Sequence, residues 1–248
     1  MLAAERRDLL LTRLRTDGKV VAKDLAAELG LSEDSIRRDL RDLAAQGLCQ
    51  KVYGGAVPAS PAVVDYAGRR ALAPESKQEV ARRAARLVHP GAVVVLDGGT
   101  TALAVAGALP ADLTCTVVTH SPTVAVALLE HPGVETILIG GRIFKHSAVA
   151  CGAAAVEAAG SVSADLFLLG VTGVHLEHGL TTGDADEAAM KRALSRRAAE
   201  TWVLASAEKL GTASAFDVLG LDDVAGIVTD GGDHEVSRGL AARGIAVL

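Results

Sequence analysis

Three arginines near the start of the chain, Arg37, Arg38 and Arg41, form a compact group of fixed positive charges. At 100° per residue of an α-helix they fall within an arc of about 100°. Guanidinium groups on one side of a helix can bind guanine O6 and N7 in the major groove of DNA, or clamp its phosphates. The alternative is an ordinary solvated face, on which the arginines pair with nearby aspartates, namely Asp34, Asp39 and Asp42.

A second group of polar residues, at positions 97–101, forms the glycine-rich stretch Asp-Gly-Gly-Thr-Thr. It follows an apolar run at 93–96 and precedes a helical pattern, so we expect it at a strand-to-helix turn. There Gly99 lets backbone N–H groups approach an anion, the helix N-terminus attracts negative charge, and Thr100 and Thr101 add hydroxyl donors. The stretch matches neither Walker A nor G-x-G-x-x-G, so a nucleotide is not indicated. The alternative is a purely structural turn.

Further polar residues follow later apolar runs. Thr119 and His120 come after the run at 116–118, and Gly141 follows the run at 136–139. Because ligands of open α/β sheets bind at the carboxyl ends of the strands, these residues can converge on one ligand with the 97–101 stretch. Taken singly, a glycine pair at such a place more often serves the turn itself.

Glu187, Lys191 and Lys209 complete the set of candidate ligand-binding residues. Glu187 and Lys191 lie four positions apart on a predicted helix and therefore share one of its faces. An ordinary surface ion pair is the alternative explanation of that spacing.

The remaining reactive residues indicate neither a metal site nor a catalytic triad. Three widely spaced cysteines fit a reduced protein better than a disulfide framework or a zinc site. His175 and His178 flank Glu177 in a predicted loop, but no fourth ligand is evident. No Ser/His/Asp or Cys/His arrangement with a recognised turn occurs. We therefore expect no metal, no cofactor and no catalytic residue.

The arginines require a helix that other elements hold in place, and the start of the chain supplies one. Helical patterns at 5–17, 22–29 and 32–46 are separated by glycines and a tight turn, which is the order of a helix-turn-helix. Along the third helix an apolar stripe runs opposite the arginines and would pack on the other helices; it consists of Ile36, Leu40 and Leu43.

A hairpin follows the third helix, with strands expected at 48–52 and 56–57. It completes a winged helix-turn-helix domain that we assign to residues 1–57. Besides the arginines, the residues expected to contact DNA lie at the start of the third helix and on the wing: Ser32, Ser35, Lys51 and Tyr53.

From residue 75 onward, β-branched apolar runs alternate with helical patterns. Strands are expected at 93–96, 116–118, 136–139, 166–169, 201–204 and 227–229. Uninterrupted runs of this kind are typical of a parallel sheet covered on both faces. We assign residues 75–248 to an α/β domain that senses an effector, and the poorly patterned, proline-containing residues 58–74 to a linker.

Composition and charge limit the possibilities further. Half of the 248 residues are apolar, yet only one Trp, two Tyr and three Phe occur, so the core is built from Ala, Val and Leu. The net charge of −5 divides into +1 for residues 1–57 and −6 for the rest. DNA contact therefore depends on local clustering of arginines and not on overall charge. No leader or membrane-spanning run is evident, and we expect a cytoplasmic protein.

A longer motif carries a specific resemblance. The stretch at 30–40 reads GLSEDSIRRDL, and Gly47-Leu48 and VYGGA at 52–56 follow it. This pattern resembles the signature of the DeoR family of bacterial transcription regulators, and the resemblance continues through the C-terminal half. It implies a DNA-binding winged helix-turn-helix followed by an α/β sensor domain with a mainly parallel sheet, similar to ribose-5-phosphate isomerase-like folds.

The resemblance also implies roles for single residues. The D-x-G-T-T motif of the family is a phosphate-binding loop for sugar-phosphate effectors, and Asp97, Gly99, Thr100 and Thr101 match it. Later family motifs near the effector match the other candidate residues: Thr119, His120, Gly141, Glu187, Lys191 and Lys209. The chain departs from the family pattern at His120, where Asn is usual, and at Ser206, where Asp is usual.

We therefore predict a cytoplasmic repressor of a carbohydrate or related metabolic operon. It would bind double-stranded operator DNA as a homo-oligomer and respond to a phosphorylated sugar-type effector. The alternative is a sugar-phosphate isomerase-like enzyme, in which acid and base groups beside the sugar phosphate shuttle a proton. An isomerase gains nothing evident from a winged helix. A third possibility, an architectural DNA-binding protein without an effector, leaves the 97–101 stretch unexplained.

Overall fold

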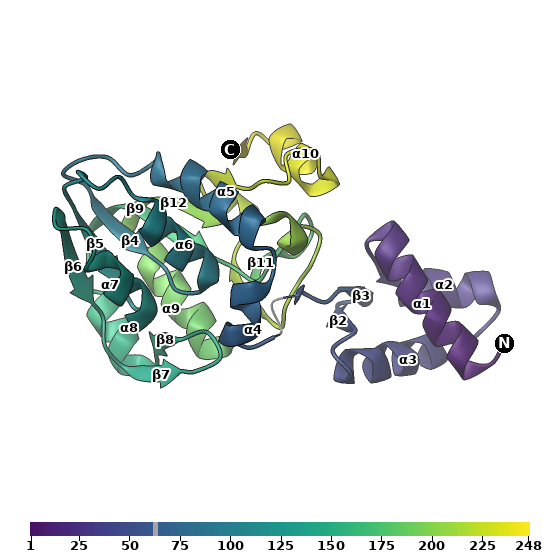
Figure 1. Ribbon diagram of the computed structural model, residues 1–248. Helices are drawn as coiled ribbons and strands as arrows, with labels where there is room; N and C mark the ends of the chain where they lie inside the picture. The colour runs from purple at the N-terminus through teal and green to yellow at the C-terminus, as the bar shows by residue number, and fades with distance from the viewer. Residues whose placement is uncertain (62–63) are drawn as a thin grey trace.

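The computed structural model describes residues 1–61 and 64–248. Figure 1 shows a small helical head, drawn in purple and dark blue, beside a larger α/β body that contains the C-terminus. Strand β3 leaves the head toward the body, and helix α4 lies on the body side of that connection. The chain thus places its arginine cluster and its glycine-rich stretch in separate parts of the molecule.

The head consists of three helices and a small sheet. Its helices are α1 (Ala3–Asp17), α2 (Ala22–Leu29) and α3 (Glu33–Ala45). Its antiparallel sheet has the order β1-β3-β2, with β1 (Val20–Val21), β2 (Cys49–Val52) and β3 (Gly55–Pro58). The sequence predicted the three helices and the two strands of the hairpin. It missed β1, because two residues are too few to carry a strand pattern.

The helices of the head close around the apolar stripe of α3. Ile36, Leu40 and Leu43 are almost completely buried against Leu10 of α1 and Leu25 of α2. Glycines in the left-handed conformation end the first two helices, as the sequence indicated. The stripe therefore fixes α3 so that its opposite face points outward.

The body is built on a seven-stranded sheet in which every neighbouring pair is parallel. Its order is β15-β14-β12-β9-β4-β5-β6. The strands are β4 (Val93–Leu96), β5 (Cys115–Thr119), β6 (Val134–Leu138), β9 (Ala164–Gly170), β12 (Ala198–Leu204), β14 (Gly226–Val228) and β15 (Ala246–Val247). All six predicted strands lie in this sheet, and the parallel arrangement confirms the fold class. The short edge strand β15 was not predicted.

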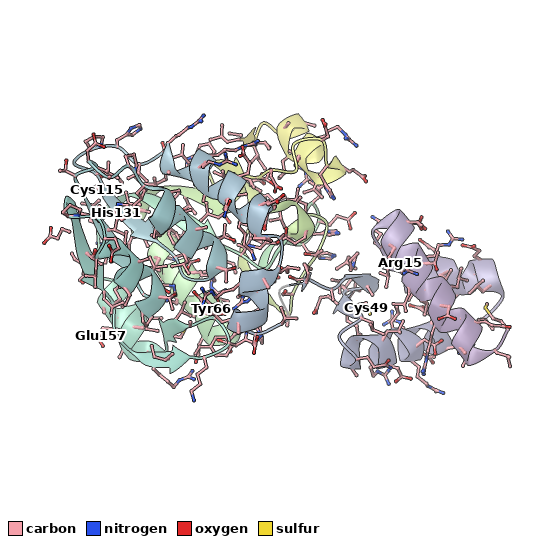
Figure 2. All side chains as sticks on the ribbon, in the orientation of Figure 1. Arg15, Cys49, Tyr66, Cys115, His131 and Glu157 are labelled. Atoms are coloured by element: carbon pink, nitrogen blue, oxygen red, sulfur yellow. The ribbon has the colours of Figure 1, made fainter. Side chains whose placement is uncertain are left out.

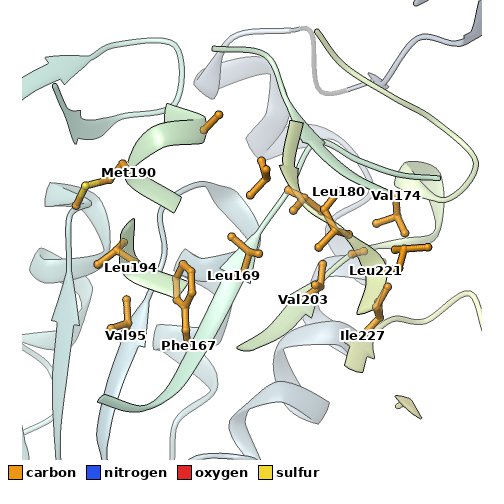
Figure 3. Packing of buried hydrophobic residues seen from close by; sticks show 14 of the residues in the cluster. Val95, Phe167, Leu169, Val174, Leu180, Met190, Leu194, Val203, Leu221 and Ile227 are labelled. Carbon is orange, nitrogen blue, oxygen red and sulfur yellow. The ribbon is translucent and has the colours of Figure 1, made fainter. Parts of the chain in front are cut away.

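Helices cover both faces of this sheet, and alternate strand residues face opposite ways. Val94 and Leu96 of β4 pack with one set of helices, α5 (Pro74–Ala85), α6 (Thr100–Ala108) and α7 (Pro122–Leu128). Val95 packs on the other face, with α8 (Ala153–Ala159), α9 (Ala185–Ser195) and α10 (Glu235–Ala242). Figure 3 shows Phe167 and Leu169 of β9 on that second face, near Leu194 of α9. The two apolar faces explain the uninterrupted apolar runs of the sequence.

Smaller elements complete the body. They are helix α4 (Tyr66–Ala71), the hairpin β7 (Arg142–Phe144) and β8 (Val149–Cys151), the antiparallel sheet of β10 (Gly173–His175), β11 (Gly179–Thr182) and β13 (Phe216–Leu219), and the 3-10 turns η2 (Ala207–Lys209) and η3 (Leu221–Asp223). Among the described residues, no helix is long and apolar enough to span a membrane.

The stretch at 58–74 is expected to be a linker, and residues 62 and 63 of it lie outside the described residues. Its described part contains α4 and is attached to the body. Pro58 and Ser60 exchange backbone hydrogen bonds with Ala213, at 3.3 Å each. The Ser60 hydroxyl also donates to the carbonyl oxygen of Thr172 at 2.5 Å. The connection between head and body is therefore joined to two segments of the body, through an isolated parallel bridge between Ala59 and Ala213 and through the hydrogen bond to Thr172.

Candidate functional site

The outward face of α3 carries the first candidate site. Ser32 is the N-cap of the helix, and its hydroxyl accepts a hydrogen bond from the backbone N–H of Ser35. The two serine hydroxyls lie 2.9 Å apart at the exposed end of the helix. This cap uses a donor group that would otherwise lack a partner, and it fixes where the helix begins.

Two aspartates of α3, Asp39 and Asp42, pair with arginines of helix α1 and not with the arginines of α3. Asp39 is buried and binds Arg6 and Arg7 of α1, and Asp42 binds Arg7 at 2.5 Å. These ion pairs tie α1 to α3 on the inner side of the head. The alternative in which Asp39 and Asp42 neutralise the outer arginines is therefore wrong for this structure.

The three arginines themselves are exposed. Arg37 donates to Glu33, one turn earlier, at 2.6 and 2.8 Å. Arg38 and Arg41 form no hydrogen bond or ion pair within the described part of the chain. Two of the three guanidinium groups are thus free to meet an external partner.

The wing places two more candidate residues on the surface. Lys51 of β2 is exposed, and Tyr53 in the hairpin turn is fully exposed. The turn depends on glycine, since Gly54 has a φ of +80° and a Cβ on Gly55 would lie 1.8 Å from the carbonyl oxygen of Val20. A fully exposed tyrosine on a rigid turn is available for contact with another molecule.

The second candidate site is a pocket in the body, at the carboxyl ends of β4 and β9. It is lined by the N-terminus of α6, by the turn after β9, and by side chains from α4, α5, α9 and η2. Of the predicted effector residues, six line it: Gly99, Thr100, Thr101, Glu187, Lys191 and Lys209. Residues more than a hundred positions apart in the sequence therefore meet in one pocket.

The glycine-rich stretch forms the turn from β4 into α6, as predicted. Gly99 is the N-cap of α6 and has a φ of +93°, which favours glycine. A Cβ on Gly98 would lie 2.0 Å from a methyl group of Val149, so no larger residue fits there. The backbone N–H groups at the start of α6 consequently face the pocket without intervening side chains.

Asp97 lies beneath the pocket and is completely buried. One carboxylate oxygen accepts from Lys191 Nζ at 2.6 Å and from the Gly170 N–H at 2.8 Å. The other accepts from His120 Nε2 at 2.7 Å and from the Gly98 N–H at 2.8 Å. Burial would raise the pKa of this carboxyl, but the Lys191 ammonium and His120 outweigh it and hold the pKa below its ordinary value.

His120 supports Asp97 and does not line the pocket. Its Nδ1 lies 2.8 Å from the carbonyl oxygen of Ala150, while Nε2 faces the Asp97 carboxylate. Both of these partners are hydrogen-bond acceptors. The residue that departs from the family pattern is therefore a support for the buried carboxylate in this structure.

Glu187 and Lys191 are buried, and the surface ion pair considered as an alternative does not apply to them. Lys191 lies 3.2 Å from Glu187, which also accepts from the hydroxyls of Ser147 and Thr182. Burial would lower the pKa of Lys191, but Asp97 and Glu187 raise it above its ordinary value. Lys191 is consequently a fixed cation at the base of the pocket.

Lys209 differs from Lys191 because no carboxylate in the described part of the chain forms an ion pair with it. Its ammonium lies 3.3 Å from the Thr101 hydroxyl, at the start of α6. Burial lowers the pKa of Lys209 to about 8, the nearby cations contribute in the same direction, and Glu208 opposes them. An anion bound at this place would restore the charge of Lys209 and raise its pKa again.

Four residues that sequence reasoning missed also line the pocket: Arg69, Lys77, Ser147 and Glu208. Lys77 donates to the backbone carbonyl oxygens of Arg69 and Leu72 and so holds the end of α4. Only Glu208 lies beside a predicted residue, Lys209, in the sequence. The other three could not be predicted from the sequence, because a lone Arg, Lys or Ser outside a motif does not indicate a pocket.

Besides Asp97 and His120, two further predicted effector residues lie away from the pocket lining. Thr119 is buried at the end of β5, where its hydroxyl accepts from the Ser121 N–H. Gly141 precedes β7 and packs against Ala155 and Cys151. Both positions serve turns in this structure. In the described part of the chain, no group of three His, Cys, Asp or Glu residues is arranged to hold a metal ion.

Comparison with known proteins places both parts of the chain. The family model described as DeoR C terminal sensor domain matches residues 72–231, and that of the DeoR-like helix-turn-helix domain matches residues 6–62. The putative aga operon transcriptional repressor of Escherichia coli O157:H7 is 32% identical over 99% of this chain and 93% of its own length. The chain belongs to the DeoR family. It is a transcription regulator with a helix-turn-helix domain and a sensor domain.

Other DeoR-family relatives and one solved fold extend this comparison. The HTH-type transcriptional regulator GlpR of Haloferax volcanii is 34% identical over all of this chain and 98% of its own length. A ribose-5-phosphate isomerase A from Methanocaldococcus jannaschii is 18% identical and covers 55% of this chain and 54% of its own, with a TM-score of 0.41. So low a score carries no argument about function. The curated relatives named here are regulators, in agreement with the prediction that this chain is not an enzyme.

Proposed function

We propose that this regulator represses a carbohydrate-type operon and that a phosphorylated sugar or related metabolite controls it. The observation that carries the proposal is Lys209, a buried ammonium at the N-terminus of α6 that has no carboxylate partner among the described residues. The helix N-terminus, the threonine hydroxyls and this lysine are the donors that a phosphate group accepts best. A phosphate there would satisfy all of them together.

The charge of the pocket supports a phosphate in preference to a neutral sugar. The pocket holds four cationic side chains, Arg69, Lys77, Lys191 and Lys209, against three carboxylates, which are Glu187 and Glu208 in its lining and Asp97 beneath it. Such an excess of positive charge in a buried place is costly unless an anion enters. A phosphate monoester, with a charge of about −1.5 to −2 at neutral pH, fits that excess.

The carboxylates of the pocket are poorly suited to isomerase chemistry, which is the alternative function. Asp97 is held ionised by Lys191 and His120 and lies beneath the lining. Glu187 accepts from two hydroxyls and binds Lys191. A general base needs a carboxylate with a free oxygen that faces the substrate. The carboxylate oxygens of Asp97 and Glu187 all have protein partners instead.

For DNA we propose that α3 enters the major groove. Arg38 and Arg41 would contact bases or phosphates, with Arg37 after release from Glu33. Ser32, Ser35, Lys51 and Tyr53 would contact the sugar–phosphate backbone on either side. Pairs of heads in a homo-oligomer would bind repeated half-sites in the cytoplasm.

The route from effector to DNA head is also part of the proposal. The Pro58–Ser60 connection, residues 58–60, binds the carbonyl oxygen of Thr172 and the backbone of Ala213. Thr172 lines the pocket, and Ala213 follows Lys209 by one short turn. A shift of either segment on phosphate binding would therefore displace the strand that leads into the wing.

A thermal-shift screen with phosphorylated sugars tests the sensor part of this proposal. The parent protein is expected to be stabilised by at least one of them, and the Thr100→Val/Thr101→Val double variant is not. Thr123→Val, which changes a threonine outside the pocket lining, is the matched control and should respond like the parent. Equal stabilisation of the parent and the double variant would contradict the placement of the phosphate.

A further inference from the structure

Arg69 of α4 is buried but poorly satisfied. It is 8% exposed, and its Nη2 donates to the His146 carbonyl oxygen at 2.5 Å and to the Ser147 hydroxyl at 3.3 Å. Its Nε is buried and has no hydrogen-bond partner among the described residues. No carboxylate of the described chain forms an ion pair with it. A buried guanidinium normally has a charged partner, because its desolvation is costly.

The other buried cations of the pocket are accounted for. Lys191 binds Asp97 and Glu187, and Lys77 donates to two backbone carbonyl oxygens. Lys209 stands at the N-terminus of α6, where the proposed phosphate binds. Arg69 comes from a different element and is anchored elsewhere, to the turn between β7 and β8. Among the described residues its side chain forms no hydrogen bond with α6 or with Lys209, so it is not one of the donors assigned to the phosphate.

The anchoring of Arg69 is rigid. The Ser147 hydroxyl that accepts from Arg69 also lies 3.2 Å from Glu187, which binds Lys191. In addition, Lys77 of α5 donates a hydrogen bond to the backbone carbonyl oxygen of Arg69. A guanidinium fixed in this way loses little freedom when it binds a ligand, so its position selects for ligands with an acceptor at the matching place.

We propose that Arg69 forms a second oxyanion subsite of the effector pocket. The effector then carries, besides its phosphate, a carboxylate or a second phosphate, as in a phosphorylated sugar acid or a sugar bisphosphate. Arg69 binds this group through the N–H donors that have no protein partner. The inference rests on the proposed function, because it takes the phosphate at α6 as the first subsite.

Two matched pairs of compounds test this subsite. Sorbitol 6-phosphate and 6-phosphogluconate differ only in a terminal hydroxymethyl or carboxylate group. Fructose 6-phosphate and fructose 1,6-bisphosphate differ only in the second phosphate. Each compound is titrated into the full-length parent and into Arg69→Gln and Arg70→Gln, with affinity measured by calorimetry. Arg70 is the neighbouring, exposed arginine of α4, so its variant has the same charge change at the surface.

In at least one pair, the parent is expected to bind the compound with two anionic groups about tenfold or more tightly than the compound with one. The reason is that a charge-assisted hydrogen bond to the second group adds to the affinity. Arg69→Gln loses this preference but still binds the singly phosphorylated compound, and Arg70→Gln keeps it. Arg69→Lys, which keeps the charge without the planar fork, recovers only part of it. Near-ultraviolet circular dichroism at Trp202 checks that each variant is folded.

The outcomes separate this subsite from the proposed function. Equal affinity of the parent for both members of each pair, or a preference that survives in Arg69→Gln, overturns the Arg69 subsite and leaves the phosphate sensor standing. A loss of every phosphate compound in Arg69→Gln also overturns it, because Arg69 is then part of the first subsite. A parent that binds none of the compounds contradicts the sensor and the subsite together.

Discussion

The head and the body of this protein both carry cations that we propose bind phosphates, but they hold these cations in opposite ways. On α3, Arg38 and Arg41 are exposed and form no hydrogen bond or ion pair with any described residue. In the pocket, Lys191, Lys209 and Arg69 are buried, and each has at least one acceptor from the chain. Exposed charges cost little to hold and are screened by salt, whereas buried charges are costly and are screened little. The first arrangement suits a long polyanion, and the second suits one small ligand.

The largest expected effect of this difference is on stability. Lys191→Met removes a cation from between Asp97 and Glu187 and leaves their charges buried. We expect a loss of about 3–5 kcal/mol in the free energy of unfolding of the body. Urea unfolding followed by the fluorescence of Trp202, the one tryptophan of the sequence, measures it.

Lys51→Met is the matched control, since Lys51 is an exposed lysine of the wing. Its urea midpoint should equal that of the parent. A similar loss of unfolding free energy in both variants, or no loss in either, would contradict the distinction between buried and exposed cations.

The second effect concerns DNA. Arg38→Ala and Arg41→Ala should each weaken operator binding by about tenfold, because a good arginine contact to a base is worth at least that much. If the arginine binds a phosphate instead, the slope of log affinity against log salt falls by about 0.9. Fluorescence anisotropy at several salt concentrations separates the two cases. Arg70→Gln, on the body, should change neither quantity.

The third effect is a pH dependence confined to the pocket. Lys209 has a pKa of about 8 in the free protein, below its ordinary value. A bound phosphate favours the charged form, so affinity is full below pH 8 and is lost as the pH rises through that value. Between pH 7 and pH 9 the effector should bind about tenfold more weakly. Calorimetry in matched buffers measures this, and Lys209→Met should bind weakly with no pH dependence in that range.

The smallest effect tests the connection between the two regions. Ser60→Ala removes the hydroxyl that binds the Thr172 carbonyl oxygen. We expect operator affinity and effector affinity, each measured alone, to change by less than about twofold. The change in operator affinity caused by the effector should shrink several-fold, because coupling energies of this kind are only about 1–3 kcal/mol. An undiminished response in Ser60→Ala would place the coupling elsewhere.

Patterns that repeat along one element were predictable from the sequence. The apolar stripe of α3 and the runs of β4, β5 and β9 needed only local spacing, and the structure confirms them. The Asp-Gly-Gly-Thr-Thr stretch was also placed correctly at a strand-to-helix turn.

Contacts between distant elements were not predictable in the same way. Arg69 enters the pocket only because α4 folds back over α6, in a region where the sequence indicated a linker. His120 points to Asp97 and not to the pocket, because the path of β5 turns its side chain inward. The partners of Asp39 likewise come from another helix. Such pairings depend on tertiary packing, which spacing along one segment does not contain.

One measurement tests the central claim, that phosphate binding in the body controls DNA binding by the head. It is the affinity of the full-length protein for its own upstream DNA, with and without the phosphorylated compound that stabilises it most. We predict a preference over random duplex and a change of about fivefold or more on adding the compound, absent in Thr100→Val/Thr101→Val. An operator affinity that is the same with and without the compound would contradict the account.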